Sequence, residues 1–389
     1  MIFKYDYIIK NGIMIDFEKS AFYEGAIYIK NGRIVEAYDE AEATEVIDAS
    51  GKYVLPGLID AHSHYFYGGS NCGISADSFC LPCGITTGVD AGSTGLMGFR
   101  AFYNSCIVPS MTELFAYINI SPEGLKAWYK HGEVHDPDDI QFKELLRLFQ
   151  QYPKTIKGLK VRICKETSMG YGLSPLSEAI ECANQIESEG FRCIVAVHCA
   201  NLPEDGPIDG ILDLLRPGDS YTHPYQNLGE LIFNDDRTVY QSIKNARKKG
   251  VLFETGNGGI HWSLPNITDA YKDGFFPDII SSDAVVQRIW MKPSQGLIHA
   301  MNTSMLCGMP VLEILKATTY SPAKMIGALD EIGTLEVGSR ADVAIFDIVK
   351  SPQEFYDQFG NRKKGDRVFA PLMTMREGRI VFRQIYFYD

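Results

Sequence analysis

The chain has 389 residues, of which 45% are hydrophobic and 12% aromatic, so it holds enough apolar material for one large core or two moderate ones. Acidic residues outnumber basic ones by 49 to 37, and a formal net charge of −12 leaves no broad basic surface to neutralise phosphates. Nucleic acid and an anionic membrane are therefore excluded as expected partners.

The N-terminal residues do not have the pattern of a secretion signal. MIFKYDYIIKNG carries charges where a signal peptide is apolar, and no run of about 18 uncharged apolar residues follows. The nine cysteines form an odd number in a long chain, which favours reduced thiols over a disulfide framework. We therefore expect a cytoplasmic protein.

Both ends of the chain alternate apolar and polar residues, as is typical of strands. Asn11-Gly12 and Asn31-Gly32 are strong signals for the turns between the first of these strands. The expected strands are residues 6–10, 26–30, 33–37, 333–335, 341–346, 373–376 and 379–386. The sequence predicts one composite β-sandwich domain formed by residues 1–55 plus 330–389.

The central residues have a different pattern, in which short runs rich in β-branched residues alternate with helical segments. The expected strands are residues 54–60, 84–90, 115–120, 156–163, 193–197, 220–222, 251–253 and 278–282. The expected helices include residues 139–150, 176–189, 237–249 and 311–318. This alternation predicts an α/β fold, with a (β/α)8 TIM barrel over residues 56–329, because such barrels take about 250 residues.

In such a barrel, catalytic side chains stand at the carboxyl ends of the strands. The candidates for such side chains in this chain are His62, His64, Lys160, His198, His223 and Asp283. Their spacing fits strands 1, 4, 5, 6 and 8 of a barrel with about 30 residues per repeat. Residues i and i+2 of a strand point to one side, so the two imidazoles of a His-x-His can reach one metal ion. Imidazole together with carboxylate is a typical zinc donor set.

This ordered set, with His62-x-His64 following Pro56-Gly57-Leu58-Ile59-Asp60, resembles the amidohydrolase superfamily over nearly the whole chain. Other segments resemble its dihydroorotase-like deacetylases, which hydrolyse N-acyl or O-acyl groups on small carboxylic acids. These segments are Gly84-Ile85-Thr86-Thr87, Asp90-Ala91-Gly92-Ser93, Gly158-Leu159-Lys160-Val161-Arg162, Leu215-Arg216-Pro217-Gly218-Asp219 and Thr222-His223. The resemblance implies a barrel, a β-sandwich from both termini and a dinuclear metal centre.

The resemblance also implies roles for the six residues. The implied ligands of two divalent metal ions, with zinc the expected element, are His62, His64 and Asp283 for one ion and His198 and His223 for the other. Lys160 would bridge them as a carbamate formed with CO2. A metal-bridging hydroxide would attack the carbonyl of a small-molecule acyl substrate, and Asp283 would carry the proton to the leaving nitrogen or oxygen.

Arg162 shares a strand face with Lys160, whereas Lys157, the nearest competitor of Lys160, lies on the opposite face. The planar fork of Arg162 fits two oxygens, so Arg162 is expected either to bind a substrate carboxylate or to form an ion pair at the barrel rim. Asn257 and His261 belong to a glycine-rich loop after strand 7, and we expect both to contact substrate.

His131 and His135 are expected in a solvated loop after strand 3. Two positions depart from the deacetylase pattern, since Asn257 replaces the histidine of a Gly-His-Gly and Val285 stands where a histidine often follows the strand-8 aspartate. Both changes concern substrate contacts and leave the metal ligands in place.

Two alternatives remain open on the sequence. One is a cyclic-amide hydrolase of the dihydroorotase or hydantoinase type. The other is a non-catalytic barrel of the same fold that binds a partner. Barrels of this kind often associate through their helices, so a homo-oligomer is compatible with the sequence.

Overall fold

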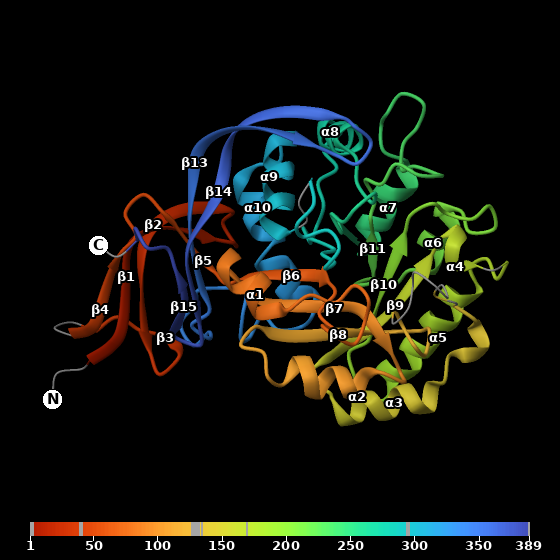
Figure 1. Cartoon of the computed structure of the whole chain (residues 1–389), viewed down its shortest axis with the longest axis horizontal. Helices are drawn as coiled ribbons and strands as arrows, with labels where there is room; N and C mark the ends of the chain where they lie inside the picture. Colours follow the sequence, from red (N-terminus) through yellow and green to blue (C-terminus); the bar gives the residue numbers. More distant parts are fainter. Residues whose placement is uncertain are drawn as a thin grey trace.

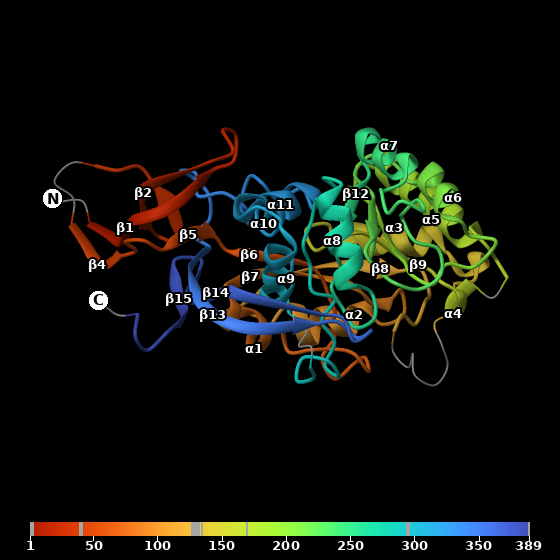
Figure 2. The same ribbon diagram turned by 90° about the horizontal axis from the view of Figure 1, so that it is seen from above.

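The computed structural model of the protein describes residues 4–38, 42–125, 133, 135–168, 170–292 and 296–387. Two sheets organise the molecule (Figure 1). One is a parallel sheet of seven strands in the order β12-β11-β10-β9-β8-β7-β6, and the other is a mixed sheet of eight strands. The mixed sheet lies at one end of the molecule and the parallel sheet, with helices around it, at the other (Figures 1 and 2).

The mixed sheet combines strands from both ends of the chain. They are β1 (Lys4–Asp16), β2 (Ala21–Lys30), β3 (Arg33–Val35), β4 (Glu42–Asp48), β5 (Tyr53–Pro56), β13 (Val343–Tyr356), β14 (Arg362–Arg376) and β15 (Arg379–Arg383). The two ends meet at β5, which pairs with β1 on one side and with β13 on the other. Apolar side chains from both ends, such as Ile29 and Met373, share one core.

Asn11-Gly12 is a bulge in this sheet, and the turn predicted there is wrong. β1 continues through the pair, and its register against β2 shifts between Ile9 and Gly12. Asn11 has φ +61°, a left-handed conformation. Tight Asn-Gly turns use the same conformation, so the sequence pattern fits a bulge as well as a turn. A Cβ at position 12 would lie 2.3 Å from Val54 Cγ2, so the approach of β5 requires glycine.

The parallel sheet contains seven of the eight strands predicted for the barrel. They are β6 (Leu58–Ser63), β7 (Ile85–Gly95), β8 (Glu113–Asn119), β9 (Ile156–Ile163), β10 (Ile194–Cys199), β11 (Ser220–Thr222) and β12 (Leu252–Glu254). The eighth predicted run is an irregular segment that bridges both edges of the sheet. Glu254 pairs with Ile279, and Ser63 pairs with Ala284. The sheet is therefore curled, with its first and last strands beside the same segment.

Helices and short helical turns connect these strands (Figure 1). They are α1 (Ala76–Cys80), η1 (Leu81–Cys83), α2 (Phe99–Phe102), η2 (Tyr103–Ile107), η3 (Pro137–Asp139), α3 (Phe142–Gln151), α4 (Lys165–Ser168), α5 (Ser174–Ser188), α6 (Ile208–Leu214), α7 (Gln241–Lys249), α8 (Leu264–Lys272), α9 (Leu297–Cys307), α10 (Val311–Ala317) and α11 (Tyr320–Met325). The four predicted helices correspond to α3, α5, α7 and α10. Within the described ranges, none of the helices has the length and hydropathy of a membrane span.

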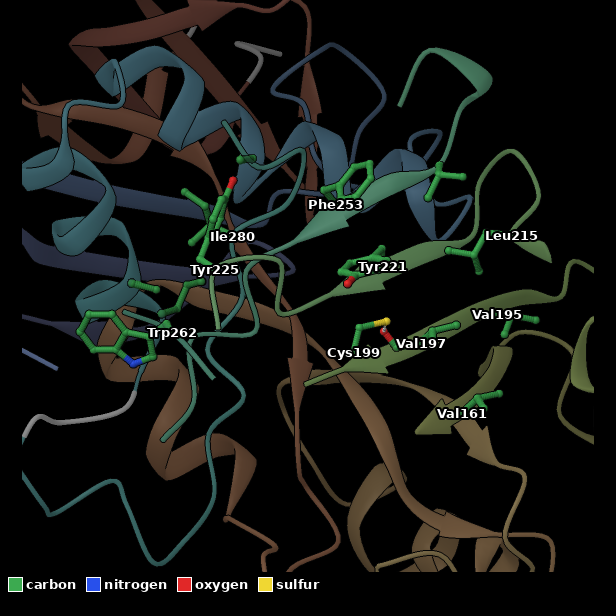
Figure 3. Close-up of a cluster of buried hydrophobic side chains, with 14 of the residues drawn as sticks. Val161, Val195, Val197, Cys199, Leu215, Tyr221, Tyr225, Phe253, Trp262 and Ile280 are labelled. Atoms are coloured by element: carbon green, nitrogen blue, oxygen red, sulfur yellow. Dashed lines mark hydrogen bonds between the residues drawn. The ribbon is translucent and has the colours of Figure 1, made fainter. Parts of the chain in front are cut away.

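Side chains of the parallel strands alternate between two faces. On β10, Val195, Val197 and Cys199 belong to one hydrophobic cluster with Tyr221 and Phe253 of the neighbouring strands (Figure 3). His198 lies between two of these residues and therefore points to the opposite face of the sheet. All nine cysteines are in the described residues and none forms a disulfide, in agreement with the predicted reduced thiols.

β13 and β14 form a hairpin that is much longer than the strands predicted there. The prediction stopped short because the middle of the hairpin is rich in charged residues and lacks the regular alternation of a strand. The hairpin leaves the mixed sheet and extends along α9 toward α8 (Figure 1). Asn302 of α9 accepts a hydrogen bond from Phe369 N at 2.8 Å. Near the hairpin tip, Asp357 Oδ2 accepts one from Leu264 N, the first residue of α8, at 2.9 Å. The C-terminal strands thus brace a loop of the parallel-sheet region.

Candidate metal centre

A cavity of about 290 Å³ opens at the carboxyl ends of the parallel strands. Its walls combine apolar side chains, such as Leu228 and Ile260, with a concentration of ionisable groups. The ionisable side chains that line it are His62, His64, Lys160, Arg162, Glu166, His198, His261, Asp283 and Arg288. His223 is fully buried beside this lining, with its Nε2 3.0 Å from His198 Nδ1. The structure thus brings the six predicted residues together.

Two groups of potential metal-donor atoms share the cavity. They are His62, His64 and Asp283 in one group and His198, His223 and His261 in the other, with the donor atoms of each group within 4.8 Å of one another. Asp283 connects the groups. Its Oδ1 lies 3.5 Å from His62 Nε2 and 3.3 Å from His64 Nε2, while its Oδ2 lies 2.9 Å from His261 Nδ1.

Glu254 fixes the orientation of His62. Its Oε1 lies 3.3 Å from His62 Nδ1, and its Oε2 accepts hydrogen bonds from Ser220 Oγ at 3.0 Å and Thr222 Oγ1 at 3.2 Å. Burial lowers the pKa of His62 and so favours its neutral form, in which a proton on Nδ1 leaves a lone pair on Nε2. This lone pair faces Asp283 and the cavity.

Ser93 fixes His64 in the same way. Ser93 Oγ donates to Asp90 Oδ2 at 2.7 Å, so it is left to accept a hydrogen bond from His64 Nδ1 at 3.0 Å. His64 Nε2 is then unprotonated and faces Asp283. Burial alone would raise the pKa of Asp283, but the hydrogen bond from His261 Nδ1 holds it well below its usual range. Asp283 is therefore ionised.

The second group has a comparable arrangement. His223 Nδ1 lies 2.9 Å from the carbonyl oxygen of Gly256 and must donate to it, which leaves a lone pair on Nε2, toward His198. Burial holds the pKa of both histidines well below the usual value, so the pair is neutral. Two neutral imidazoles in contact with a third, His261, form a nitrogen-rich donor set that suits zinc and similar divalent ions.

Lys160, on β9, lines the same cavity as these groups. The residue is 2% exposed, and its Nζ is 3.4 Å from His62 Nε2. Burial lowers the pKa of Lys160, which favours the neutral amine. Lys157 is on the opposite face of the strand, with its Nζ 4.5 Å from the centre of the Phe115 ring, and it does not line the cavity.

The backbone at two of these residues is strained. His223 has φ +70° and Asp283 has φ +47°, a region that residues other than glycine rarely adopt and that is common at functional sites. Close packing of the glycine-rich loop keeps both side chains in place. A Cβ at Gly256 would lie 2.4 Å from His223 Nδ1, and one at Gly258 would lie 2.3 Å from Asp283 Oδ2. The loop therefore needs glycine at these two positions.

Sequence reasoning missed the residues that orient the predicted ligands. Glu254 stands directly after the apolar run Val251-Leu252-Phe253, and a buried acid at such a strand end was an available signal. Asp60 is also fully buried and accepts hydrogen bonds from Ser282 N at 2.9 Å and Ser282 Oγ at 2.5 Å. It ties β6 to the segment that carries Asp283, and burial raises its pKa to about 7.

Arg162 forms an ion pair with Glu133, at 2.5 Å between Nη1 and Oε2. An ion pair is one of the two roles predicted for Arg162; the other is binding of a substrate carboxylate. Glu133 also contacts His135 Nε2 at 2.7 Å, and His135 is 1% exposed, so its expected position in a solvated loop is wrong. The buried carboxylate explains the difference, because it provides a partner for the imidazole away from water. His131 lies outside the described residues.

The two predicted substrate contacts occupy different positions. His261 lines the cavity and belongs to the three-histidine group, so it is a candidate metal ligand as well as a candidate substrate contact. Asn257 is buried next to the lining, and its backbone N donates to Ser281 O at 3.0 Å. Among the described residues, its Nδ2 has no hydrogen-bond partner. A substrate contact of Asn257 stays a prediction.

The chain is similar to a known family and to several known proteins. A profile described as the amidohydrolase family matches residues 221–381. A deacetylase of Agrobacterium fabrum is 29% identical over 84% of this chain and 78% of its own length. A deacetylase of Enterococcus faecalis is 29% identical over 97% of this chain and 99% of its own length.

Solved structures give the same result for the fold. One described as an adenine deaminase has a TM-score of 0.87 at 28% identity, covering 98% of this chain and 100% of its own. One described as a dihydroorotase has a TM-score of 0.83 at 26% identity, covering 97% of this chain and 98% of its own. The similarity therefore extends over both sheets.

Proposed function

We propose that this chain is a metal-dependent hydrolase of the amidohydrolase superfamily that removes an acyl group from the nitrogen or oxygen of a small carboxylic acid. One observation carries the proposal. His62 Nε2 and His64 Nε2 converge on the ionised Oδ1 of Asp283, at 3.5 and 3.3 Å. Their Nδ1 atoms face Glu254 Oε1, at 3.3 Å, and Ser93 Oγ, at 3.0 Å, so a neutral ring with its proton on Nδ1 has a lone pair on the converging nitrogen. Such an arrangement of acceptor atoms is stable when a cation lies between them.

The fold proposal follows from the contacts of the segment that carries Asp283. Hydrogen bonds connect the segment 278–284 to β6 through Asp60 and to β12 through Ile279 N, which donates to Phe253 O at 3.2 Å. We propose that this segment serves as the eighth strand and closes the (β/α)8 barrel. The barrel domain then spans residues 56–329, and residues 1–55 plus 330–389 form the composite β-sandwich domain.

The donor atoms fit two divalent ions, with zinc the expected element. His62, His64 and Asp283 would hold one ion, His198 and His223 the other, and Lys160 would join them as a carbamate, since its burial favours the neutral amine that reacts with CO2. When bound, such ions lower the pKa of water toward about 7 and polarise a carbonyl oxygen.

Asp283 is the residue that moves the proton. Its carboxylate is ionised and faces the cavity, so it can accept a proton from the attacking water and deliver it to the leaving nitrogen or oxygen as the bond to the carbonyl carbon breaks. His261 holds Oδ2 at 2.9 Å and so keeps the carboxylate in one orientation. Apolar walls such as Leu228 and Ile260 limit the amount of water around the reacting groups.

A second candidate reaction is the opening of a cyclic amide. It is favoured by the similarity to a structure described as a dihydroorotase, which extends over 97% of this chain. The same groups would serve it, because the bond broken is again an amide. The non-catalytic alternative has little support, since the predicted donor residues are all present around one cavity.

A substrate screen on the purified, metal-replete protein tests the proposal. The panel contains N-acetyl and O-acetyl carboxylic acids, hydantoins, dihydroorotate and adenine, with Asp283→Asn and the exposed Asp366→Asn as paired variants. Release of acetate that only Asp283→Asn abolishes supports acyl hydrolysis. Ring opening of the hydantoins or dihydroorotate alone would instead support the second candidate, and deamination of adenine alone would contradict both. Absence of turnover on the whole panel in a protein that retains its metal would contradict both.

A further inference from the structure

Two arginines line the cavity, and they differ in their partners. Arg162 is engaged by the buried Glu133, and its Nη2 also contacts Cys164 Sγ at 3.8 Å. Arg288 is partly buried in the cavity wall, and no described side chain forms an ion pair or a hydrogen bond with its guanidinium. It is therefore the arginine whose fork remains available to a ligand.

The backbone around Arg288 places it beside the candidate metal centre. The segment after Asp283 turns at Val285, where Arg288 N donates to Val285 O at 2.9 Å. Val286 N donates to Cys72 O at 2.9 Å, which fastens the segment to another part of the cavity wall. Arg288 and Asp283 line the same cavity, so a molecule held at Asp283 lies within the enclosure that Arg288 faces.

The remaining lining predicts the kind of molecule. Cys72, Ala91, Leu125, Ala200 and Val285 contribute apolar surface, which suits a short hydrocarbon portion. The volume of about 290 Å³ is at the lower end for small-molecule sites, so the ligand is compact. A guanidinium at the wall of such a cavity binds the two oxygens of a carboxylate through a pair of parallel hydrogen bonds.

We propose that Arg288 binds the carboxylate of the substrate and selects small acyl acids against their neutral counterparts. This assignment rests on the proposed hydrolase function and names Arg288 as the residue that determines its substrate specificity. Arg162 is then a structural partner of Glu133, which resolves the two roles that the sequence left open for it. The acyl group would lie at Asp283, and the carboxylate would lie at the wall formed by residues 285–288.

Binding of uncleavable probes tests the assignment separately from catalysis. N-methanesulfonyl alanine, leucine and phenylglycine, in both configurations, resist hydrolysis, and each is compared with its own carboxamide by calorimetry on the metal-replete protein. We expect the best acid to bind about 10- to 100-fold more tightly than its amide. Arg288→Gln should remove this preference and Arg288→Lys should keep part of it. Arg367→Gln, at an exposed arginine of β14, should leave it unchanged.

Equal affinity for acid and amide, a preference that survives Arg288→Gln, or failure of every probe to bind would overturn the assignment. A failure of the Arg288 assignment can be distinguished from a failure of the proposed hydrolase function. If the preference depends on Arg288 but the substrate panel is not hydrolysed, the hydrolase proposal fails and the binding site stands. If acyl acids are hydrolysed with no effect of Arg288→Gln on acid binding, the assignment of Arg288 fails and the hydrolase proposal stands.

Discussion

Glu254 Oε1 lies 3.3 Å from His62 Nδ1 in a part of the parallel sheet that solvent does not reach. The carboxylate is fully buried, and its other oxygen is held by the hydroxyls of Ser220 and Thr222. This anchoring aims His62 Nε2 at the cavity and makes it a stronger donor. Glu254 is thus a positioning residue of the candidate metal centre.

Glu254→Gln should weaken metal binding by about 10- to 100-fold, because a neutral amide supports the imidazole less well than a carboxylate. The affinity is measured by competition with a chromophoric chelator. Ser220→Ala is the matched control, since it removes a hydrogen bond to the other oxygen of Glu254 and leaves the contact with His62. Equal affinities in the two variants would show that Glu254 has no part in metal binding.

A carbamate on Lys160 should be visible with ¹³C-labelled bicarbonate. The labelled protein is expected to give a carbamate carbon signal by NMR that Lys160→Ala lacks, because Lys160 is the one described lysine that lines the cavity. Lys157→Ala is the matched control, as this lysine is on the opposite face of the same strand, over Phe115. A signal that persists in Lys160→Ala, or is lost in Lys157→Ala, would refute the assignment.

The long C-terminal hairpin should stabilise the loop that carries His261. Asp357 is 2% exposed and accepts the hydrogen bond from Leu264 N, so Asp357→Ala leaves a buried donor unpaired at a cost of about 1–3 kcal/mol. We expect faster hydrogen exchange in residues 256–264, measured by mass spectrometry. Glu354→Ala, in an exposed ion pair with Arg362 on the same hairpin, should leave this exchange unchanged. Unaltered exchange in Asp357→Ala would argue against the bracing role.

His299 should make the protein less stable in acid. Its ring lies between Trp262 and Phe355, with ring centroids 5.7 and 6.0 Å away, and desolvation there lowers its pKa to about 4. A histidine in the unfolded chain has a pKa of about 6.5, so between these values the unfolded state binds more protons and the free energy of unfolding falls as pH falls. The contribution is on the order of 2 kcal/mol.

The check compares His299→Phe with the parent protein by denaturant unfolding at pH 7 and pH 4.5. The variant should lose less stability than the parent over this range, because phenylalanine takes up no proton. The difference between the two losses isolates His299 from groups that titrate in both proteins. Equal losses would show that the histidine is not held in its neutral form by the fold.

Much of the parallel sheet and of the candidate site was predictable because local pattern and spacing determine both. Seven of the expected strands occur, since buried β-branched runs have few alternatives in a chain that alternates strand and helix. His62, His64, Lys160, His198 and Asp283 line one cavity because strand ends meet at one edge of such a sheet.

The features that were not predictable depend on contacts between distant residues. The bulge at Asn11-Gly12 depends on Val54, and the burial of His135 depends on Glu133 and on Arg162 of the next strand. The hairpin of β13 and β14 extends beyond its sheet because it packs on α9, which its charged sequence does not reveal. The irregular segment 278–284 connects both edges of the sheet through single bridges and side chains such as Asp60, which no periodic pattern predicts.

Metal content per chain tests the central claim most directly. The protein is purified without chelator and measured by plasma mass spectrometry, together with a variant that carries His64→Ala and His198→Ala, one substitution in each donor group. The account predicts about two equivalents of divalent metal in the parent and a clear loss in the variant. A parent protein that is folded, holds no metal and takes up none from zinc-containing buffer would contradict it.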